Sequence, residues 1–218
     1  MSAILDGLRV TLGVAALSVM VASVLGVLGA ACKLGVSPVL KRGTGLYITI
    51  IRGIPELVLM LLVFYGGQAA VNVVELALGL DYIDVNPFVA GVLTLGFIFG
   101  AYLTETFRGA ILAVPRGQAE AGRALGLRPM QVRRLIVAPQ TVRHALPGFT
   151  NTLLVMVKAT ALVSVIGLDD MVNRAGLAAS ATREPFTFYG ALGLIDLVTT
   201  SVSPLALAAL ARRFPARA

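Results

Sequence analysis

The sequence predicts an all-α integral membrane protein with five transmembrane helices, organised as a single domain over residues 1–218. Composition is the first observation behind this prediction. Of the 218 residues, 57% are hydrophobic and 13% are charged, whereas a soluble domain carries about 25% charged residues. Long windows with few or no charges are the second observation, because about 20 apolar residues in a helix cross the hydrocarbon core of a bilayer. A soluble fold of this length could not bury so much apolar surface.

The apolar windows predict where each span lies. The first window is free of charge and longer than the apolar region of a signal peptide, so we expect a span and not a cleaved leader. The second window is interrupted by Arg52, Pro55 and Glu56, the fourth by Lys158 and the fifth by Asp196. The predicted spans are residues 10–32, 46 to about 66, 85–104, 145–168 and 186–210.

The basic residues are distributed asymmetrically. They follow the first and third predicted spans and end the chain, whereas the other connections carry mostly carboxylates. Because positively charged loops stay in the cytoplasm, the N-terminus is predicted outside and the C-terminus inside. The formal net charge of +7 is therefore a topology signal and not a nucleic-acid footprint. The residues that set the orientation are Lys33, Lys41, Arg42, Arg108, Arg116, Arg123, Arg128, Arg133, Arg134, Arg143, Arg212, Arg213 and Arg217.

Residue types that carry chemistry are scarce. Cys32 is the single cysteine, which excludes an intramolecular disulfide, and His144 is the single histidine, which leaves no cluster for a metal site. No serine is placed to pair with His144 as nucleophile and base, which argues against an intramembrane hydrolase. The sequence also lacks a GxxxxGK[ST] phosphate-binding loop. We expect no cofactor, no metal and no catalysis by this chain itself.

The connection over about residues 108–146 contains a predicted short helix, "GQAEAGRAL". Glu120 lies in its first turn, where a negative charge suits the helix dipole, and Gly126 is placed to end it. A helix surfaced by alanine and glycine lets another backbone approach closely, with Leu125 and Leu127 as apolar anchors, so it suits insertion into a protein groove. Composition alone leaves an alternative open, in which the loop lies on lipid headgroups through its arginines.

This loop resembles the EAA loop of ABC importer permease subunits. The matching residues are Glu120, Ala121 and Gly122, followed by Gly126, Ile136 and Pro139. Nearly the whole chain resembles the polar amino acid permeases, and most narrowly the Q-type subunit of histidine/lysine/arginine and octopine/nopaline importers. The other stretches that carry the resemblance are "RGIPEL" (52–57), "FYGGQAAVN" (64–72), "TETFRGAI" (104–111), "KATALVSVIGL" (158–168), "REPFTFY" (183–189) and the "ARRF" tail.

The resemblance implies the type I ABC importer permease fold in the bacterial inner membrane, with a periplasmic N-terminus and a cytoplasmic C-terminus. It further implies an amino acid ligand, a second, non-identical permease subunit, a cytoplasmic ABC ATPase dimer that hydrolyses ATP, and a periplasmic substrate-binding protein. A permease for another polar amino acid is the main alternative. A self-contained channel or carrier is a weaker one, because no inverted repeat is present. The residues implied to couple to the ATPase are Glu120, Ala121, Gly122, Ala124, Leu125 and Gly126.

The sequence departs from the family pattern at two places. Gly122 stands where the motif has its second alanine, which should loosen the helix by up to about 1 kcal/mol. Ala159 and Ala161 stand where many relatives have aspartate and serine, which weakens any inference about the substrate from that stretch.

Ionisable residues inside the membrane are costly and predict a substrate pathway that includes Arg52, Glu56, Lys158 and Thr160. Proline before Glu56 should break the second span and free backbone groups that can line a cavity. Glu56 then either receives the cationic end of a ligand or pairs with Arg52. Lys158 contacts the substrate carboxylate, bonds to a loop carbonyl or pairs with Asp196. Since "RGxPE" resembles the basic amino acid class, the predicted substrates are arginine, lysine, histidine or opine-type derivatives.

Three polar residues near the predicted span ends, Gln68, Asn72 and Asn151, are expected to form packing hydrogen bonds.

Overall fold

The computed structural model describes the backbone of residues 2–79 and 81–211, and the side chains of residues 4–79 and 81–202. The chain is helical throughout this part, with no strand among the described residues. The helices are α1 (Ser2–Leu34), α2 (Pro38–Gly53), α3 (Glu56–Leu78), α4 (Pro87–Leu112), α5 (Arg116–Ala124), α6 (Pro129–Gln131), the π-helix η1 (Val132–Val137), α7 (Ala138–Ala159), the 3-10 helix η2 (Thr160–Ile166), α8 (Met171–Thr182) and α9 (Pro185–Ala211).

Five helical segments of the described chain are long and apolar enough to cross a membrane, as predicted. The first, third, fourth and fifth lie where the sequence places them, although most extend beyond the predicted bounds. They are Ile4–Leu34, Glu56–Leu78, Pro87–Leu112, Pro129–Ile166 and Pro185–Val202.

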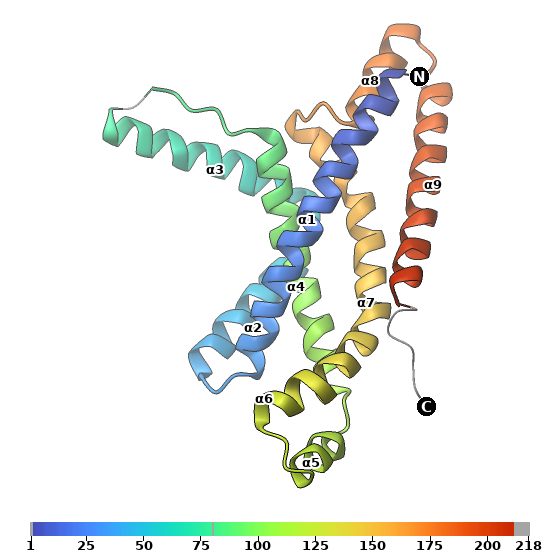
Figure 1. Cartoon of the computed structure of the whole chain (residues 1–218). Helices are drawn as coiled ribbons and strands as arrows, with labels where there is room; N and C mark the ends of the chain where they lie inside the picture. The colour runs from blue at the N-terminus through green and yellow to red at the C-terminus, as the bar shows by residue number, and fades with distance from the viewer. Residues whose placement is uncertain (1, 80, 212–218) are drawn as a thin grey trace.

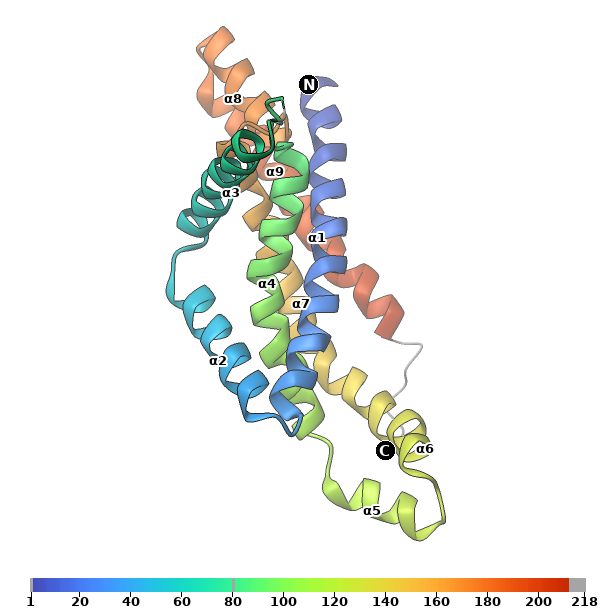
Figure 2. The ribbon, with the colours of Figure 1, turned by 90° about the vertical axis from the view of Figure 1, so that its left-hand side faces the viewer.

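The predicted second span, residues 46 to about 66, is wrong in its bounds. The chain leaves the helix after Gly53, with Ile54 extended (φ −109°, ψ 138°) and Pro55 at ψ 137°, and α3 begins at Glu56. Proline has no backbone N–H and disfavours a helical residue before it, so a continuous helix cannot pass this point. The spanning helix is therefore α3 alone, and α2 is a separate helix beside α4 (Figure 2).

The centre of the bundle is the contact between α1 and α4, which run side by side in both views (Figures 1 and 2). A Cβ added at Gly96 would lie 2.5 Å from Cγ1 of Val21, and one at Gly100 would lie 2.9 Å from Cβ of Leu25. From the other side, a Cβ at Gly29 would lie 2.3 Å from Oγ1 of Thr104. Glycine at these positions lets the two backbones approach, which is how membrane helices gain packing contacts.

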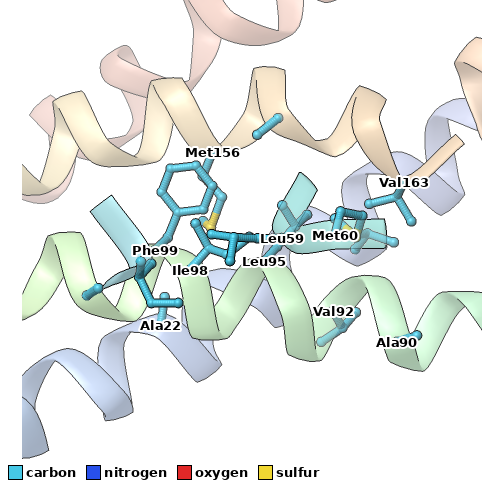
Figure 3. Close-up of a cluster of buried hydrophobic side chains, with 14 of the residues drawn as sticks. Ala22, Leu59, Met60, Ala90, Val92, Leu95, Ile98, Phe99, Met156 and Val163 are labelled. Atoms are coloured by element: carbon cyan, nitrogen blue, oxygen red, sulfur yellow. The ribbon is translucent and has the colours of Figure 1, made fainter. Parts of the chain in front are cut away.

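A second layer of apolar side chains joins α4 to α3, α7 and η2 (Figure 3). Phe99 and Leu95 of α4 meet Met60 of α3, Met156 of α7 and Val163 of η2, and all are almost fully buried. Only the first turns of α3 take part, and the rest of α3 projects from the bundle (Figure 1). The break at Pro55 therefore sits against the core.

The segment that leads from α3 back to α4 is held by polar side chains of α3. Gln68 accepts a hydrogen bond from N of Val85 (2.7 Å) and donates to O of Ile83 (3.0 Å) and to Oδ1 of Asn72 (2.8 Å). The buried Glu75 accepts from N of Ile83 (2.8 Å). The packing hydrogen bonds predicted for Gln68 and Asn72 are confirmed.

The corresponding prediction for Asn151 is not tested by the single chain. Its side chain is exposed on α7 and forms no hydrogen bond with any residue that the structure describes.

At the opposite end of the bundle from α5, helix α8 packs on the start of α1 (Figure 1). A Cβ at Gly7 would lie 2.7 Å from N of Met171, so the two backbones touch there. Asp170 caps α8 by accepting from N of Asn173 (2.9 Å). Burial raises the pKa of the Asp170 carboxyl, and its hydrogen bonds oppose that shift.

Replacing Gly96 with alanine is expected to destabilise the folded protein by about 1–3 kcal/mol, because the added Cβ overlaps Val21 and forces α1 away from α4. Thermal unfolding in detergent measures the change. The matched control is Gly109→Ala in the same helix, where an added Cβ meets no atom within 4 Å. That control should keep the stability of the wild type or gain up to about 1 kcal/mol from helix propensity. Equal melting temperatures for the two variants would mean that the α1–α4 contact can relax.

Candidate functional site

The predicted helix in the connecting loop is present as α5, and it ends where the sequence indicates. Gly126 adopts a left-handed conformation (φ +78°) and donates to O of Arg123 (2.9 Å), while Leu127 donates to O of Gly122 (3.1 Å). This pair of bonds is a Schellman motif, which satisfies carbonyls at the end of a helix. Figure 2 shows α5 and α6 at one end of the bundle, beyond the ends of α1 and α4.

Gly122 is the buried residue of α5. A Cβ added there would lie 2.5 Å from Cδ1 of Ile136 and 3.2 Å from Cγ2 of Val132, both in or at the start of η1. Glycine thus allows α5 to pack closely on η1, at the helix-propensity cost of up to about 1 kcal/mol that the sequence predicts. The glycine that departs from the family motif faces inward, toward the chain's own π-helix.

The outward face of α5 combines small and charged residues. Glu120, Ala121 and Ala124 are exposed, and the Leu125 side chain just beyond α5 is 82% exposed. Leu127, expected as a second anchor, is partly buried, with its Cδ1 3.7 Å from the Cβ position of Gly122. Leu125 is therefore the apolar side chain that this end of the loop presents outward.

The structure does not contain an Arg52–Glu56 ion pair. Arg52 ends α2 and Glu56 begins α3, so the two residues are not one turn apart on a single helix. The Arg52 guanidinium lies over the ring of Tyr102 in α4, with its carbon 4.9 Å from the ring centroid. A cation over an aromatic face is stabilised by the ring quadrupole, so Arg52 has a partner other than Glu56.

Glu56 lies on the face of α3 that packs on the bundle. Leu59 and Met60, three and four residues later, share this face and are buried against α4 and α7 (Figure 3). The Glu56 side chain is half-buried, and none of the ion pairs among the described residues includes it. The result is a carboxylate at a helix break, beside an apolar core and without an ion-pair partner in the described part of the chain.

Lys158 and Thr160 are close in sequence but point to different places. Lys158 is exposed on α7, on the same stripe as Asn151 and Val155. Thr160 is buried at the start of η2, and its hydroxyl donates to O of Val157 (2.6 Å). The structure therefore does not bring these two predicted pathway residues together.

The predicted Lys158–Asp196 pair is absent from the ion pairs of the described residues. Asp196 instead lines a cavity of about 180 Å³ together with Thr11, Thr160 and Tyr189. The pair does not form because Lys158 is exposed on α7, whereas Asp196 of α9 faces the cavity that α9 forms with α1, α7, η2 and α8.

Sequence reasoning missed a charged cluster at the end of the bundle near α5. Glu105 of α4 accepts a hydrogen bond from Lys33 of α1 (2.6 Å) and one from Nε of Arg108 (2.9 Å). The spacing of Glu105 and Arg108 by three residues was a signal for one of these bonds. No sequence signal links Lys33 to Glu105, because only the α1–α4 contact brings them together.

Known proteins share this arrangement over nearly the whole chain. The family described as "Binding-protein-dependent transport system inner membrane component" matches residues 12–214. The chain is 52% identical over 215 residues to the histidine/lysine/arginine/ornithine transport system permease protein HisQ of Salmonella typhimurium, covering 97% of this chain and 92% of that protein. It is 45% identical over 168 residues to the arginine ABC transporter permease protein ArtQ of Haemophilus influenzae, covering 77% of this chain and 74% of that protein.

The fold is also that of a solved transporter. A chain in the crystal structure of an amino acid ABC transporter with histidines matches with a TM-score of 0.82 and 32% identity, covering 97% of this chain and 94% of that chain. The type I importer permease fold is therefore confirmed. Permease subunits of this family are not themselves catalytic. The chain belongs to the family of binding-protein-dependent transport system inner membrane components, as an ABC importer permease subunit of the polar amino acid class.

Proposed function

We propose that this chain is the permease subunit of an ATP-driven importer for basic amino acids, namely arginine, lysine, histidine or opine-type derivatives. The observation that carries the proposal is the half-buried Glu56 carboxylate at the break between α2 and α3, which has no ion-pair partner among the described residues. An unneutralised carboxylate inside a membrane is costly, and the cationic end of a basic ligand would neutralise it. The names of the relatives, which transport histidine, lysine, arginine and ornithine, support the same class.

The pathway is completed by a second, homologous but non-identical permease subunit. The stripe of α7 that carries Asn151, Val155 and Lys158 is uncovered in the single chain and holds the lysine needed to attract a substrate carboxylate. Arg52, over Tyr102, is the other cation near the break. Thr160 acts indirectly, because its bond to O of Val157 holds the backbone on both sides of Lys158.

A dimer of cytoplasmic ABC ATPases binds α5 and hydrolyses ATP, and a periplasmic binding protein delivers the amino acid. The outward face of α5 suits a groove because the exposed Ala121 and Ala124 are small, the exposed Glu120 side chain is flexible, and Leu125 supplies an apolar anchor. Its Schellman end and its contact with η1 through Gly122 hold α5 in one orientation. Motion of the ATPase is then transmitted to α7, which continues from η1 without a loop.

The orientation that this function requires places α5 in the cytoplasm and the N-terminus in the periplasm. The positive-inside rule supports it, because Arg116 and Arg123 lie in α5 and Arg128 follows it. The end of the bundle that carries α8 and the segment before α4 then faces the binding protein.

Replacing Glu56 with glutamine should reduce arginine transport by roughly 10- to 150-fold, because a charge-assisted hydrogen bond contributes about 1.5–3 kcal/mol. Uptake into proteoliposomes that contain the complete importer and its binding protein measures this. The ATPase rate stimulated by the binding protein should change less, because α5 is unaltered.

The matched control is Glu184→Gln, an exposed carboxylate outside the proposed pathway, which should transport normally. Normal arginine uptake by the Glu56→Gln importer, or failure of that variant to fold, would assign Glu56 a structural role. Selective uptake of a different polar amino acid by the wild type would favour the alternative substrate class.

Replacing Ala121 with arginine should abolish both transport and copurification of the ATPase, because bulk and positive charge block insertion of α5. Insertion of the permease into the membrane should be unchanged. The same substitution at Ala181, which is exposed in α8, should keep the ATPase bound, because α8 lies at the opposite end of the bundle from α5 (Figure 1). If the Ala121→Arg importer still transports and retains its ATPase, α5 is not the coupling element.

Cysteines introduced at Asp81 and at Arg128, in a Cys32→Ala background, should react with a membrane-impermeant maleimide from opposite faces. Both positions are exposed, so reagent access depends only on the side of the membrane. In intact cells with a permeabilised outer membrane, position 81 should label and position 128 should label only after lysis. Labelling of both positions in intact cells would overturn the proposed orientation.

A further inference from the structure

A groove of about 690 Å³ lies between α1, α4, η1 and α7 at the end of the bundle that carries α5. Its walls are almost entirely apolar, formed by Val27 of α1, Phe107 and Ile111 of α4, and Val142 and Phe149 of α7. Phe107 and Phe149 stack across it, with ring centroids 6.3 Å apart. Among the described residues, the lining contains no carboxylate. The groove therefore lacks the group that would neutralise the cationic side chain of a basic amino acid.

Two polar groups stand out in this apolar lining. Arg133 of η1 lines the groove, is exposed, and takes part in none of the ion pairs among the described residues. Oγ1 of Thr141 also belongs to the lining residues and is buried without a hydrogen-bond partner within the described chain. The groove therefore combines one free cation and one unused hydroxyl with a long apolar surface.

The charge around the groove is positive as well. Glu105 is shared between Lys33 and Arg108, so this cluster beside the groove keeps one excess positive charge. Basic pockets between transmembrane helices at a membrane surface suit anionic lipid headgroups. Apolar walls below such a pocket suit an acyl chain, since the pocket then matches both halves of a lipid molecule.

We propose that this groove is a binding site for an anionic phospholipid, with an acyl chain along Phe107 and Phe149 and the phosphate at Arg133. The Thr141 hydroxyl supplies a donor for an oxygen of the headgroup or the ester. A bound lipid would bridge α1 and α4 to η1. Because Val132 and Ile136 of η1 are the surface on which Gly122 of α5 packs, the lipid would also stabilise the position of α5.

The site is tested by titrating the purified, delipidated importer with phosphatidylglycerol and, separately, with phosphatidylcholine, and by counting bound lipids with native mass spectrometry. Arg133→Ala should weaken the binding of phosphatidylglycerol about fivefold, the equivalent of about 1 kcal/mol for one basic residue at the surface. Its binding of phosphatidylcholine should not change. The matched control is Arg134→Ala, an exposed neighbour that does not line the groove, which should bind both lipids as the wild type does.

A second variant tests the apolar part independently. Val142→Trp, at a lining residue that is 41% exposed, should fill the groove and reduce the binding of both lipids. Equal phosphatidylglycerol binding by the wild type and Arg133→Ala, or an equal loss in Arg134→Ala, would overturn the site. Crosslinking of a cysteine at position 142 to the second permease or to the ATPase in the assembled importer would show that a protein covers the groove instead of a lipid. Transport of basic amino acids by the wild type is a separate measurement, so failure of the lipid site leaves the proposed function standing.

Discussion

The close contact between α1 and α4 is the constraint on which the rest of the molecule depends. Glycines at positions 96 and 100 of α4 let the two backbones approach, and Gly29 of α1 leaves room for the side chain of Thr104. In lipid there is little hydrophobic gain from joining helices, so stability comes from close packing and from hydrogen bonds. One such bond links Ser18 to O of Val92 (3.3 Å), deep in this contact. With α1 fixed on one face, α4 offers its other faces to the start of α3 and to α7, and the charged cluster of Lys33, Glu105 and Arg108 forms where the two helices end.

The break at Pro55 decides where the two charged residues beside it lie. If the chain had continued as one helix from α2, Arg52 and Glu56 would stand one turn apart and neutralise each other. The break separates them, sends Arg52 to the ring of Tyr102 and leaves Glu56 on the inner face of α3. The burial of Leu59 and Met60 against α4, α7 and η2 holds the carboxylate there (Figure 3). The same local feature thus interrupts the helix and leaves Glu56 outside every ion pair among the described residues.

At the end of the bundle that carries α5, two glycines fix the position and the end of that helix. Gly122 loses helix propensity but brings α5 against η1, and Gly126 ends α5 in a conformation that few other residues adopt. The π-helix continues directly into α7, so no flexible loop separates α5 from the transmembrane bundle on that side. A groove that opens between η1 and the ends of α1 and α4 lies along the same connection. Helix α5 is therefore joined to α7 through packed side chains and continuous helical backbone.

The sequence by itself determined the membrane class, four of the spans, the helix in the loop with its end at Gly126, and the break before Glu56. Each of these depends on local chemistry: the length of an apolar run, a left-handed glycine, or a proline without an N–H. The tertiary structure alone decided which side chains meet. The contact of Arg52 with Tyr102 and the Lys33–Glu105 bond join helices that are distant in sequence. The inward face of Gly122 and the separation of Lys158 from Asp196 likewise depend on how the helices pack. In an apolar sequence, hydropathy does not distinguish a helix face that packs on protein from one that faces lipid. The pairing of faces follows from the few glycines that allow close approach, and those show their role only once the helices are assembled.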